Sequence, residues 1–353
     1  MSKVSIVKCE SYEIEKVEEA TIKALNLIGG IGKIIKGKDK ILLKPNLTIA
    51  RAPELAVTTH PYLTRAVIKL IKEQGKTPLV GDASGGLMGM IRRKYKNLED
   101  QLGAEEWNKM IFSGKTLPKF LEEVKKKVRK FPEKNISQII EEAYNQVLTV
   151  TGTKEILDEF NIKATNFEED YLVVDNPQGE FLHSLILARA VIETEILISL
   201  PKLKTHSSAL LTGCIKNSFG CVPGPVKSTY HNAEKEGKFA SMFVDVFAYA
   251  KPALCIMDGI VGMEGEGPSE GRPRKIGVIL ASEDAVALDA VASAIIGYEP
   301  LRIPTIRVAS RRGLGEGNLK KIEIVGERLE DVKIDDFVHP TKREKIKIIY
   351  RNE

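Results

Sequence analysis

The regular alternation of strand-like and helix-like segments in the first 85 residues constrains the fold most. Residues 3–9, 40–47 and 77–86 are apolar segments of strand length, and residues 14–30 and 61–75 between them carry apolar side chains at helical spacing. Both helical segments end in glycine, and the second has Pro61 near its first turn. Strands separated by helices of this length predict a parallel sheet.

The alternation resumes after residue 150. Further strands are predicted at residues 171–176, 195–202, 253–262, 276–284 and 321–327, and further helices at residues 154–162, 238–252, 285–297 and 302–315. A glycine-rich loop is expected at residues 263–275. No internal repeat or long linker separates these segments, so we expect residues 1–353 to form one α/β domain, a mostly parallel, Rossmann-like doubly wound sheet flanked by helices.

Residues 88–150 interrupt this rhythm. The segment is highly charged, and residues 92–134 hold 13 Lys or Arg against 7 Asp or Glu, a net charge of +6 in a chain whose total is +5. One apolar helical face is predicted in it, formed by Phe120, Leu121, Val124 and Val128. We therefore expect a helical insertion, which is a lid, a contact in a homo-oligomer, or a solvated excursion.

Composition limits the classes of protein to consider. No apolar run approaches the roughly 18 residues that span a bilayer, and the N-terminal segment turns acidic and polar within ten residues. A cytoplasmic protein without a membrane partner is expected. Its four cysteines do not form a disulfide scaffold in a chain of this length, and its many Lys and Glu with few Gln are typical of a thermophilic source.

Charged residues follow several of the predicted strands. In open parallel α/β sheets, ligands bind beyond the carboxyl ends of the strands. Five strand ends carry charge, at Lys44-Pro45-Asn46, Gly81-Asp82, Pro201-Lys202, Asp258-Gly259 and Ser282-Glu283-Asp284. If these strands are parallel, all five ends meet at one edge of the sheet, where we expect a site.

The excess of cations among these positions predicts a small anionic ligand, phosphorylated or carboxylated, because Lys and Arg bind both groups. The predicted substrate-binding residues are Lys44, Asn46, Thr59, Ser84, Lys216, Asn217 and Arg274. Ser84 lies in "GDASGG", which is similar to a nest of backbone N–H groups but also fits a plain turn.

Acid–base and metal-binding roles are predicted for other residues at the same edge. Lysines held close together depress each other's pKa, and histidines titrate near neutrality. The predicted catalytic residues are Lys202, Lys204, His206 and His60. Asp82, Asp258 and Glu264 would hold a divalent metal or orient the lysines, and the loop carrying Glu264 also fits a mobile surface loop.

Several segments together resemble a known family. "LLKPNL", "VGDASGG", "ISLPKLKTH", "TGCIKNSFGCVPG" and "IMDGIVGMEGEGP" are similar to blocks of the domain-of-unknown-function 362 family, and the resemblance covers nearly the whole chain except residues 88–150. Many relatives carry a ferredoxin-like tail with two CxxCxxCxxxC runs. This sequence has no such run, so an iron–sulfur cluster is not expected here, and other cofactors stay undetermined.

Three functions remain open at this point. The first is an enzyme of undetermined reaction class acting on the anionic ligand. The second is a redox protein working with an electron-transfer partner, with Cys214 and Cys221 as residual ligands, although their spacing is wider than a CxxC pair and also fits small buried residues near a turn. The third, nucleic-acid binding through residues 92–134, is not expected, because the segment lacks an aromatic stacking platform.

Overall fold

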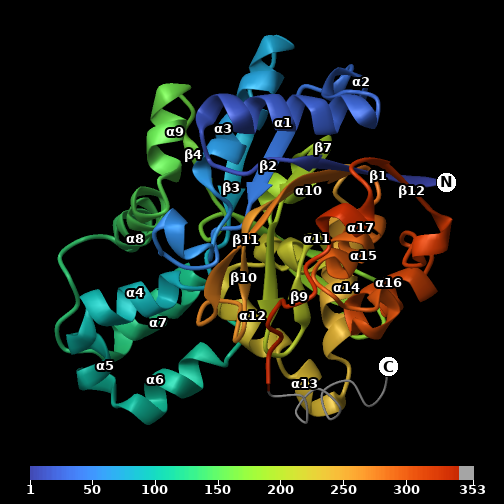
Figure 1. Cartoon of the computed structure of the whole chain (residues 1–353). Helices are drawn as coiled ribbons and strands as arrows, with labels where there is room; N and C mark the ends of the chain where they lie inside the picture. Colours follow the sequence, from blue (N-terminus) through green and yellow to red (C-terminus); the bar gives the residue numbers. More distant parts are fainter. Residues whose placement is uncertain (342–353) are drawn as a thin grey trace.

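The computed structural model describes residues 1–341, whose strands form one mixed ten-stranded sheet and a separate pair. The main sheet has the order β12-β1-β11-β10-β7-β2-β3-β4 (Figure 1). These strands are β1 (Ser2–Lys8), β2 (Ile41–Pro45), β3 (Leu79–Asp82), β4 (Ala164–Asn166), β7 (Ile196–Leu200), β10 (Leu254–Glu264), β11 (Arg272–Ser282) and β12 (Ile322–Gly326). The fold is therefore the predicted α/β class.

Strand direction follows the prediction in most of the sheet. Strands β4, β3, β2, β7 and β10 are parallel, and β12 is parallel to β1. Strand β11 is antiparallel to both of its neighbours, β10 and β1. The prediction that Ser282-Glu283-Asp284 shares an edge with the other strand ends is therefore wrong. Asp284 instead caps α15 (Ala285–Ile295), accepting hydrogen bonds from the N–H groups of Val286 and Ala287 at 2.9 Å.

Two segments predicted as loops are strands. After Pro201 the chain continues as β8 (Lys202–His206), which pairs with β10 and with the short β9 (Leu210–Thr212). The expected loop at residues 263–275 belongs to a hairpin connected by residues 265–271, since β10 runs to Glu264 and β11 begins at Arg272. The predicted strand at residues 171–176 forms outside the main sheet, as β5 (Tyr171–Asp175) paired with β6 (Ser184–Ala188).

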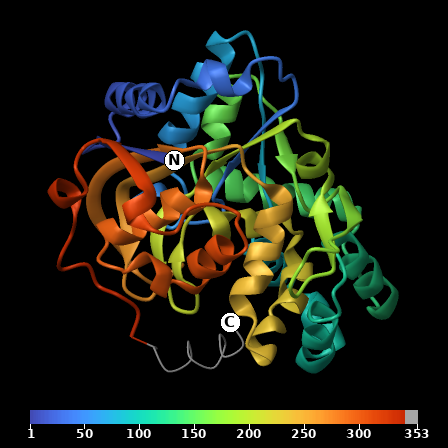
Figure 2. The same ribbon diagram turned by 90° about the vertical axis from the view of Figure 1, so that its right-hand side faces the viewer.

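Helices cover both faces of the main sheet because apolar residues of its strands point alternately to each side. Leu42 belongs to one core, with α14 (Phe239–Ala250), α15 and α16 (Pro304–Arg311). Leu43 belongs to the other, with α1 (Ile14–Leu27) and α3 (Pro61–Glu73). Figure 1 shows the blue α1 and α3 above the sheet and the orange α14 to α16 at its right, and Figure 2 turns the latter group to the front.

Residues 88–150 lie in a helical group at one side of the sheet, teal to green in Figure 1. Its members are α4 (Leu87–Lys94), α5 (Lys96–Leu102), α6 (Ala104–Ile111), α7 (Leu117–Lys127) and α8 (Ile136–Val150). Buried Trp107 and Phe120 meet edge to face, with ring centroids 5.1 Å apart. Helices α4 and α7 also contact α12 (Gly224–Tyr230), so the group reaches the segment that carries Lys227.

The remaining helices are short connections. They are α2 (Ile31–Ile35), α9 (Thr153–Glu159), α10 (Arg189–Glu193), α11 (Cys214–Asn217), α13 (Ala233–Glu236) and α17 (Leu329–Val332). Helix α11 follows the β8–β9 hairpin and lies against the carboxyl end of β2.

Candidate functional site

A lysine-rich cavity of about 160 Å³ lies at the carboxyl ends of β2 and β3. Its polar lining consists of Lys44, Asn46, Thr48, Asp82, Lys216, Asn217, Lys227 and His231. Larger hollows of about 590 and 660 Å³ lie elsewhere, but their basic residues include ones already ion-paired, such as Lys154 with Asp158 and Arg312 with Asp245. The lysine-rich cavity is therefore the strongest candidate site.

The wall of the cavity is a buried ion pair between the two strand ends. Lys44 Nζ lies 2.7 Å from Asp82 Oδ1, and the side chains are 1% and 3% exposed. Asp82 Oδ2 also accepts a hydrogen bond from the Leu47 N–H at 2.7 Å. Because a buried pair repays its desolvation only with good geometry and further hydrogen bonds, this surrounding network is what keeps both charges in place.

Asn217 ties α11 to the sheet. Its Oδ1 accepts hydrogen bonds from Lys44 Nζ at 3.3 Å and from Asn46 Nδ2 at 3.1 Å. Its Nδ2 donates to the Lys44 carbonyl at 3.2 Å and to Ser199 Oγ at 2.9 Å. At the other end of α11, the Asp289 carboxylate accepts from the N–H groups of Cys214 and Ile215, at 2.6 and 3.0 Å. The helix is thus fixed at both ends.

Lys216 lies on this anchored helix and is the least engaged of the cavity lysines. Its side chain is half-buried, with Nζ 5.1 Å from the centroid of the Phe243 ring. Among residues 1–341, Nζ of Lys216 makes no hydrogen bond and no ion pair. Burial lowers the pKa of Lys216 to about 7, and the nearby charges of Lys227 and Lys44 act in the same direction.

Lys227 closes another side of the cavity beside a carboxyl group that the sequence did not reveal. Lys227 Nζ donates to the Ala83 carbonyl at 2.6 Å. The fully buried Glu168 accepts from the Gly224 N–H at 2.7 Å through Oε2, whereas Oε1 has no hydrogen-bond partner among residues 1–341. Burial raises the pKa of Glu168 to about 7, against the opposing charge of Lys227. Glu168 therefore lies at the border of protonation near neutral pH.

His231 also lines the cavity. Its Nδ1 lies 2.6 Å from the Lys227 carbonyl, a hydrogen bond in which only the ring nitrogen can donate. This bond assigns the proton of the neutral ring to Nδ1 and leaves Nε2 as an acceptor. The ring packs edge to face on Phe219, and burial lowers the pKa of His231 below its usual value.

Lys202 and Asp258 form a second, separate buried network. Lys202 Nζ lies 2.9 Å from Asp258 Oδ2 and donates to the Tyr12 hydroxyl at 2.8 Å, and both members of the ion pair are 0% exposed. The Tyr12 hydroxyl donates to Asp258 Oδ1 at 2.7 Å. Although burial alone would raise the pKa of Asp258, the charge of Lys202 holds it below its ordinary value. These groups are satisfied by one another.

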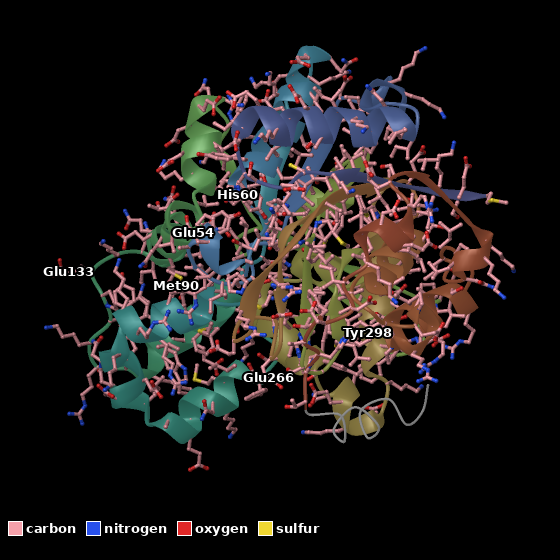
Figure 3. The ribbon with its side chains drawn as sticks, viewed as in Figure 1. Glu54, His60, Met90, Glu133, Glu266 and Tyr298 are labelled. Atoms are coloured by element: carbon pink, nitrogen blue, oxygen red, sulfur yellow. The ribbon has the colours of Figure 1, made fainter. Side chains whose placement is uncertain are left out.

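His60 joins this second network at the start of α3, where Figure 3 labels it. Its N–H donates to Asp258 Oδ2 at 2.9 Å, its Nδ1 accepts from the Tyr62 N–H at 3.2 Å, and its ring stacks on Tyr12 with centroids 3.6 Å apart. Burial lowers the pKa of His60 to about 4. The histidine is therefore neutral at physiological pH.

Lys204 and Thr59 lie behind the cavity wall. Lys204 Nζ donates to the Val57 carbonyl at 2.6 Å and to Asn46 Oδ1 at 3.3 Å, and its side chain is fully buried. Burial, followed by the charges of Lys216 and Lys202, holds the pKa of Lys204 well below its usual range. Thr59 Oγ1 accepts from the Asn46 N–H at 2.9 Å. Both residues thus position Asn46 rather than line the cavity.

The structure divides the predicted site residues into three groups. Those that line the cavity are Lys44, Asn46, Asp82, Lys216 and Asn217. Those buried behind it or in the second network are Thr59, Ser84, Lys202, Lys204, His60 and Asp258. Those placed elsewhere are His206, Glu264 and Arg274.

The residues placed elsewhere have local partners. His206 Nδ1 accepts from the N–H groups of Ser208 and Ala209 in the turn that follows β8. Arg274 pairs with Asp336 at 2.5 Å, on the far part of β11. The expectation that these two residues join Lys44 at one edge is therefore wrong, because β8 and the β10–β11 hairpin extend past the other strand ends.

The three carboxylates predicted to bind a metal do not converge. Asp82 pairs with Lys44, Asp258 with Lys202, and Glu264 with Arg272 at 2.7 Å. Within residues 1–341, no group of three or more His, Cys, Asp or Glu side chains is placed to hold a metal ion. Asp82 and Asp258 each contact a lysine, whereas Glu264 contacts an arginine, so the alternative expectation that carboxylates orient the lysines stays a prediction.

Comparison with known proteins assigns the family. The family model described as "Domain of unknown function (DUF362)" matches residues 41–294. The chain belongs to the DUF362 family. The matched residues include every lining residue of the cavity. They also include Lys202 and Asp258 of the second network, whereas Tyr12 precedes the match.

One curated DUF362-like relative is a thylakoid-associated protein of Synechocystis sp. (strain ATCC 27184 / PCC 6803 / Kazusa), which is 29% identical over 313 residues, 88% of this chain and 79% of the relative. Within residues 1–341, no helix has the length and apolar character to cross a bilayer. The expected cytoplasmic location stays a prediction.

Two solved structures are distantly similar. The lactate racemase apoprotein of Thermoanaerobacterium thermosaccharolyticum has a TM-score of 0.40 and 13% identity, over 81% of this chain and 55% of that chain. A protein of Thermotoga maritima has a TM-score of 0.37 and 12% identity, over 86% of this chain and 60% of that chain.

Proposed function

We propose that this DUF362 protein is an enzyme that binds a small phosphorylated or carboxylated molecule in the lysine-rich cavity. One observation carries the proposal: the lining holds the ammonium groups of Lys44, Lys216 and Lys227 against the single carboxylate of Asp82. The lining is therefore positive when the lysines are protonated. Neutral donors and acceptors from Asn46 and Asn217 complete the polar surface.

Enclosure strengthens this attraction. Two unit charges 4 Å apart interact by about 4 kcal/mol at an effective dielectric of about 20, against about 1 kcal/mol in water. Two of the cavity lysines are held before any ligand arrives, Lys44 by Asp82 and Asn217 and Lys227 by the Ala83 carbonyl. Such fixed charges need little rearrangement when negative charge develops on a bound molecule, which is how preorganised sites accelerate reactions.

Calorimetric titration with inorganic phosphate and with malonate, at constant ionic strength, tests the proposal. We expect saturable binding by the wild-type protein and at least tenfold weaker binding by Lys216→Met, because one of the three cavity cations is lost. The control is Lys126→Met, which removes an exposed lysine from α7 and should bind as the wild type does. Equal affinities of the two variants, or no binding of either anion by the wild type, would contradict the proposal.

The two alternative functions find less support. Cys214 and Cys221 are free and fully buried, which suits the apolar interior better than a solvent-accessible cluster. In the basic segment, many cations are already paired within the helical group: Arg92 pairs with Glu99, Lys115 with Glu123, and Lys127 with Glu106. We therefore do not propose a redox or nucleic-acid role.

A further inference from the structure

The three cavity lysines differ in how firmly they are held. Lys44 is ion-paired with Asp82 and donates to Asn217, and Lys227 donates to the Ala83 carbonyl. Lys216 has no such bond among residues 1–341, although the helix that carries it is fixed at both ends. A well-placed backbone therefore presents an uncommitted amine to an enclosed, positively charged space.

From this geometry we propose that Lys216 is a nucleophile that forms an imine with the carbonyl carbon of a small anionic aldehyde or ketone, such as a phosphorylated aldehyde or an oxo acid. The inference rests on the proposed anion-binding function and narrows its substrate class. Lys44 and Lys227, which are held in place by Asp82 and by the Ala83 carbonyl, bind the anionic group. Lys216 then attacks the carbonyl at the other end of the molecule.

The reaction balances without an oxidant or reductant. The neutral amine of Lys216 forms a C–N bond with the carbonyl carbon as the π bond of the carbonyl breaks. Nitrogen then loses one of its protons and oxygen gains one, which gives a carbinolamine. The oxygen then leaves as water after a second protonation, and nitrogen keeps one proton in the resulting iminium ion. His231 lines the same cavity and has one ring nitrogen available to exchange protons with water or ligand.

The electrostatic surroundings of Lys216 favour this role. An amine must be neutral to attack, and a typical lysine is almost fully protonated at pH 7. Burial and the charges of Lys227 and Lys44 lower the pKa of Lys216 to about 7, so about half of the molecules carry a neutral amine at neutral pH. Lys204 has a depressed pKa too, but it is fully buried and donates to the Val57 carbonyl.

Reductive trapping tests the inference on the intact protein. The wild type is incubated at pH 7 with glycolaldehyde phosphate or pyruvate and sodium cyanoborohydride, which adds hydride to the imine carbon and leaves a stable secondary amine. Peptide mass spectrometry then locates the modified lysine. We expect one dominant adduct, on Lys216, formed at least tenfold faster than at any other lysine, and much slower modification by uncharged glycolaldehyde.

A variant that keeps the positive charge separates the role of Lys216 as a nucleophile from its role as a cation. Lys216→Arg keeps a positive charge at this position but should form no adduct above the background of exposed lysines, whereas Lys126→Met should be trapped like the wild type. If phosphate binds but the adduct is absent or spread over exposed lysines, the imine inference is overturned and the anion-binding proposal stands. If neither phosphate nor glycolaldehyde phosphate binds, both the imine inference and the anion-binding proposal are wrong. If Lys216→Arg does not fold, the position of the adduct in the wild-type protein still tests the imine inference.

Discussion

Lys44 and Asp82 lie near the carboxyl ends of two neighbouring parallel strands, and their charged groups meet at 2.7 Å. The pairing of β2 with β3 makes this contact, since each strand delivers its last polar residue to the same edge. The pair fixes one cation of the cavity in place.

The close approach of Gly220 to this pair gives a first prediction. A Cβ atom at Gly220 would collide with the Asp82 carboxylate and with Lys44 Nζ. Gly220→Ala should therefore displace the pair, weaken phosphate binding at least tenfold and lower the melting temperature by several degrees. Gly89→Ala, where the nearest atom to a new Cβ is 3.9 Å away on Arg93, should change neither quantity for the worse. Calorimetry and thermal unfolding of both variants provide the measurement.

The second buried pair predicts a large effect on stability. Lys202→Met leaves the Asp258 carboxylate buried without its cation, which typically costs 3–5 kcal/mol, so we expect a loss of about that size in the free energy of unfolding. Lys8→Met removes a lysine whose side chain is 52% exposed beside Glu327, and should cost less than about 1 kcal/mol. Urea unfolding of the two variants tests the contrast. Similar small losses would show that Asp258 does not depend on Lys202.

Anion affinity should depend on pH through Lys216. Its pKa of about 7 means that the side chain gains positive charge as the pH falls from 8 to 6. Sulfate is the suitable probe, because its own charge is constant in this range. We expect the wild type to bind sulfate more tightly at pH 6 than at pH 8, and Lys216→Arg to show a much flatter dependence, since arginine stays charged. Parallel slopes for the two proteins would contradict this assignment of the titrating group.

The buried carboxyl group of Glu168 predicts that the stability of the fold depends on pH. Burial raises its pKa from 4.5 to about 7 on folding, so the folded state binds more protons between these values. The contribution of Glu168 to stability is therefore intact below pH 4.5 and is lost as the pH rises toward 7. Glu168→Gln keeps an acceptor for the Gly224 N–H without an ionisable proton. Its stability relative to the wild type should rise by about 1–3 kcal/mol between pH 4.5 and pH 8, as measured by urea unfolding.

Most of the sheet could be predicted from local patterns, but strand direction could not. The apolar run that becomes β11 has no directional signal of its own. Direction depends on the length of the connection, and a parallel crossover needs a dozen or more residues. The predicted loop at residues 263–275 was long enough for one. In the structure β10 and β11 both extend into it and leave only residues 265–271, so a hairpin results and Arg274 moves away from the cavity.

The site itself could be predicted only where strand ends reveal it. Lys44, Asn46 and Asp82 follow apolar runs and were expected at the edge, and the glycine-rich segment after β9 pointed to Lys216. Tyr12 and Glu168 have no comparable signal, because each acquires its role through partners more than 50 residues away in sequence. Burial also reversed the interpretation of Lys202 and Lys204, whose charges suggested solvent or ligand but are satisfied internally.

The alternation of side chains along β8 limits the changes of length that this strand can accept during evolution. Lys202 and Lys204 point to one side of the strand, whereas fully buried Leu203 packs in the apolar core on the other. Inserting a single residue between Pro201 and Lys202 would exchange the two sides, turning both ammonium groups into the core and Leu203 toward Asp258. Neighbouring residues can compensate for a point substitution, but they cannot compensate for a shift in the alternation of side chains along β8. Length should therefore be preserved here among functional descendants even where residue identity drifts.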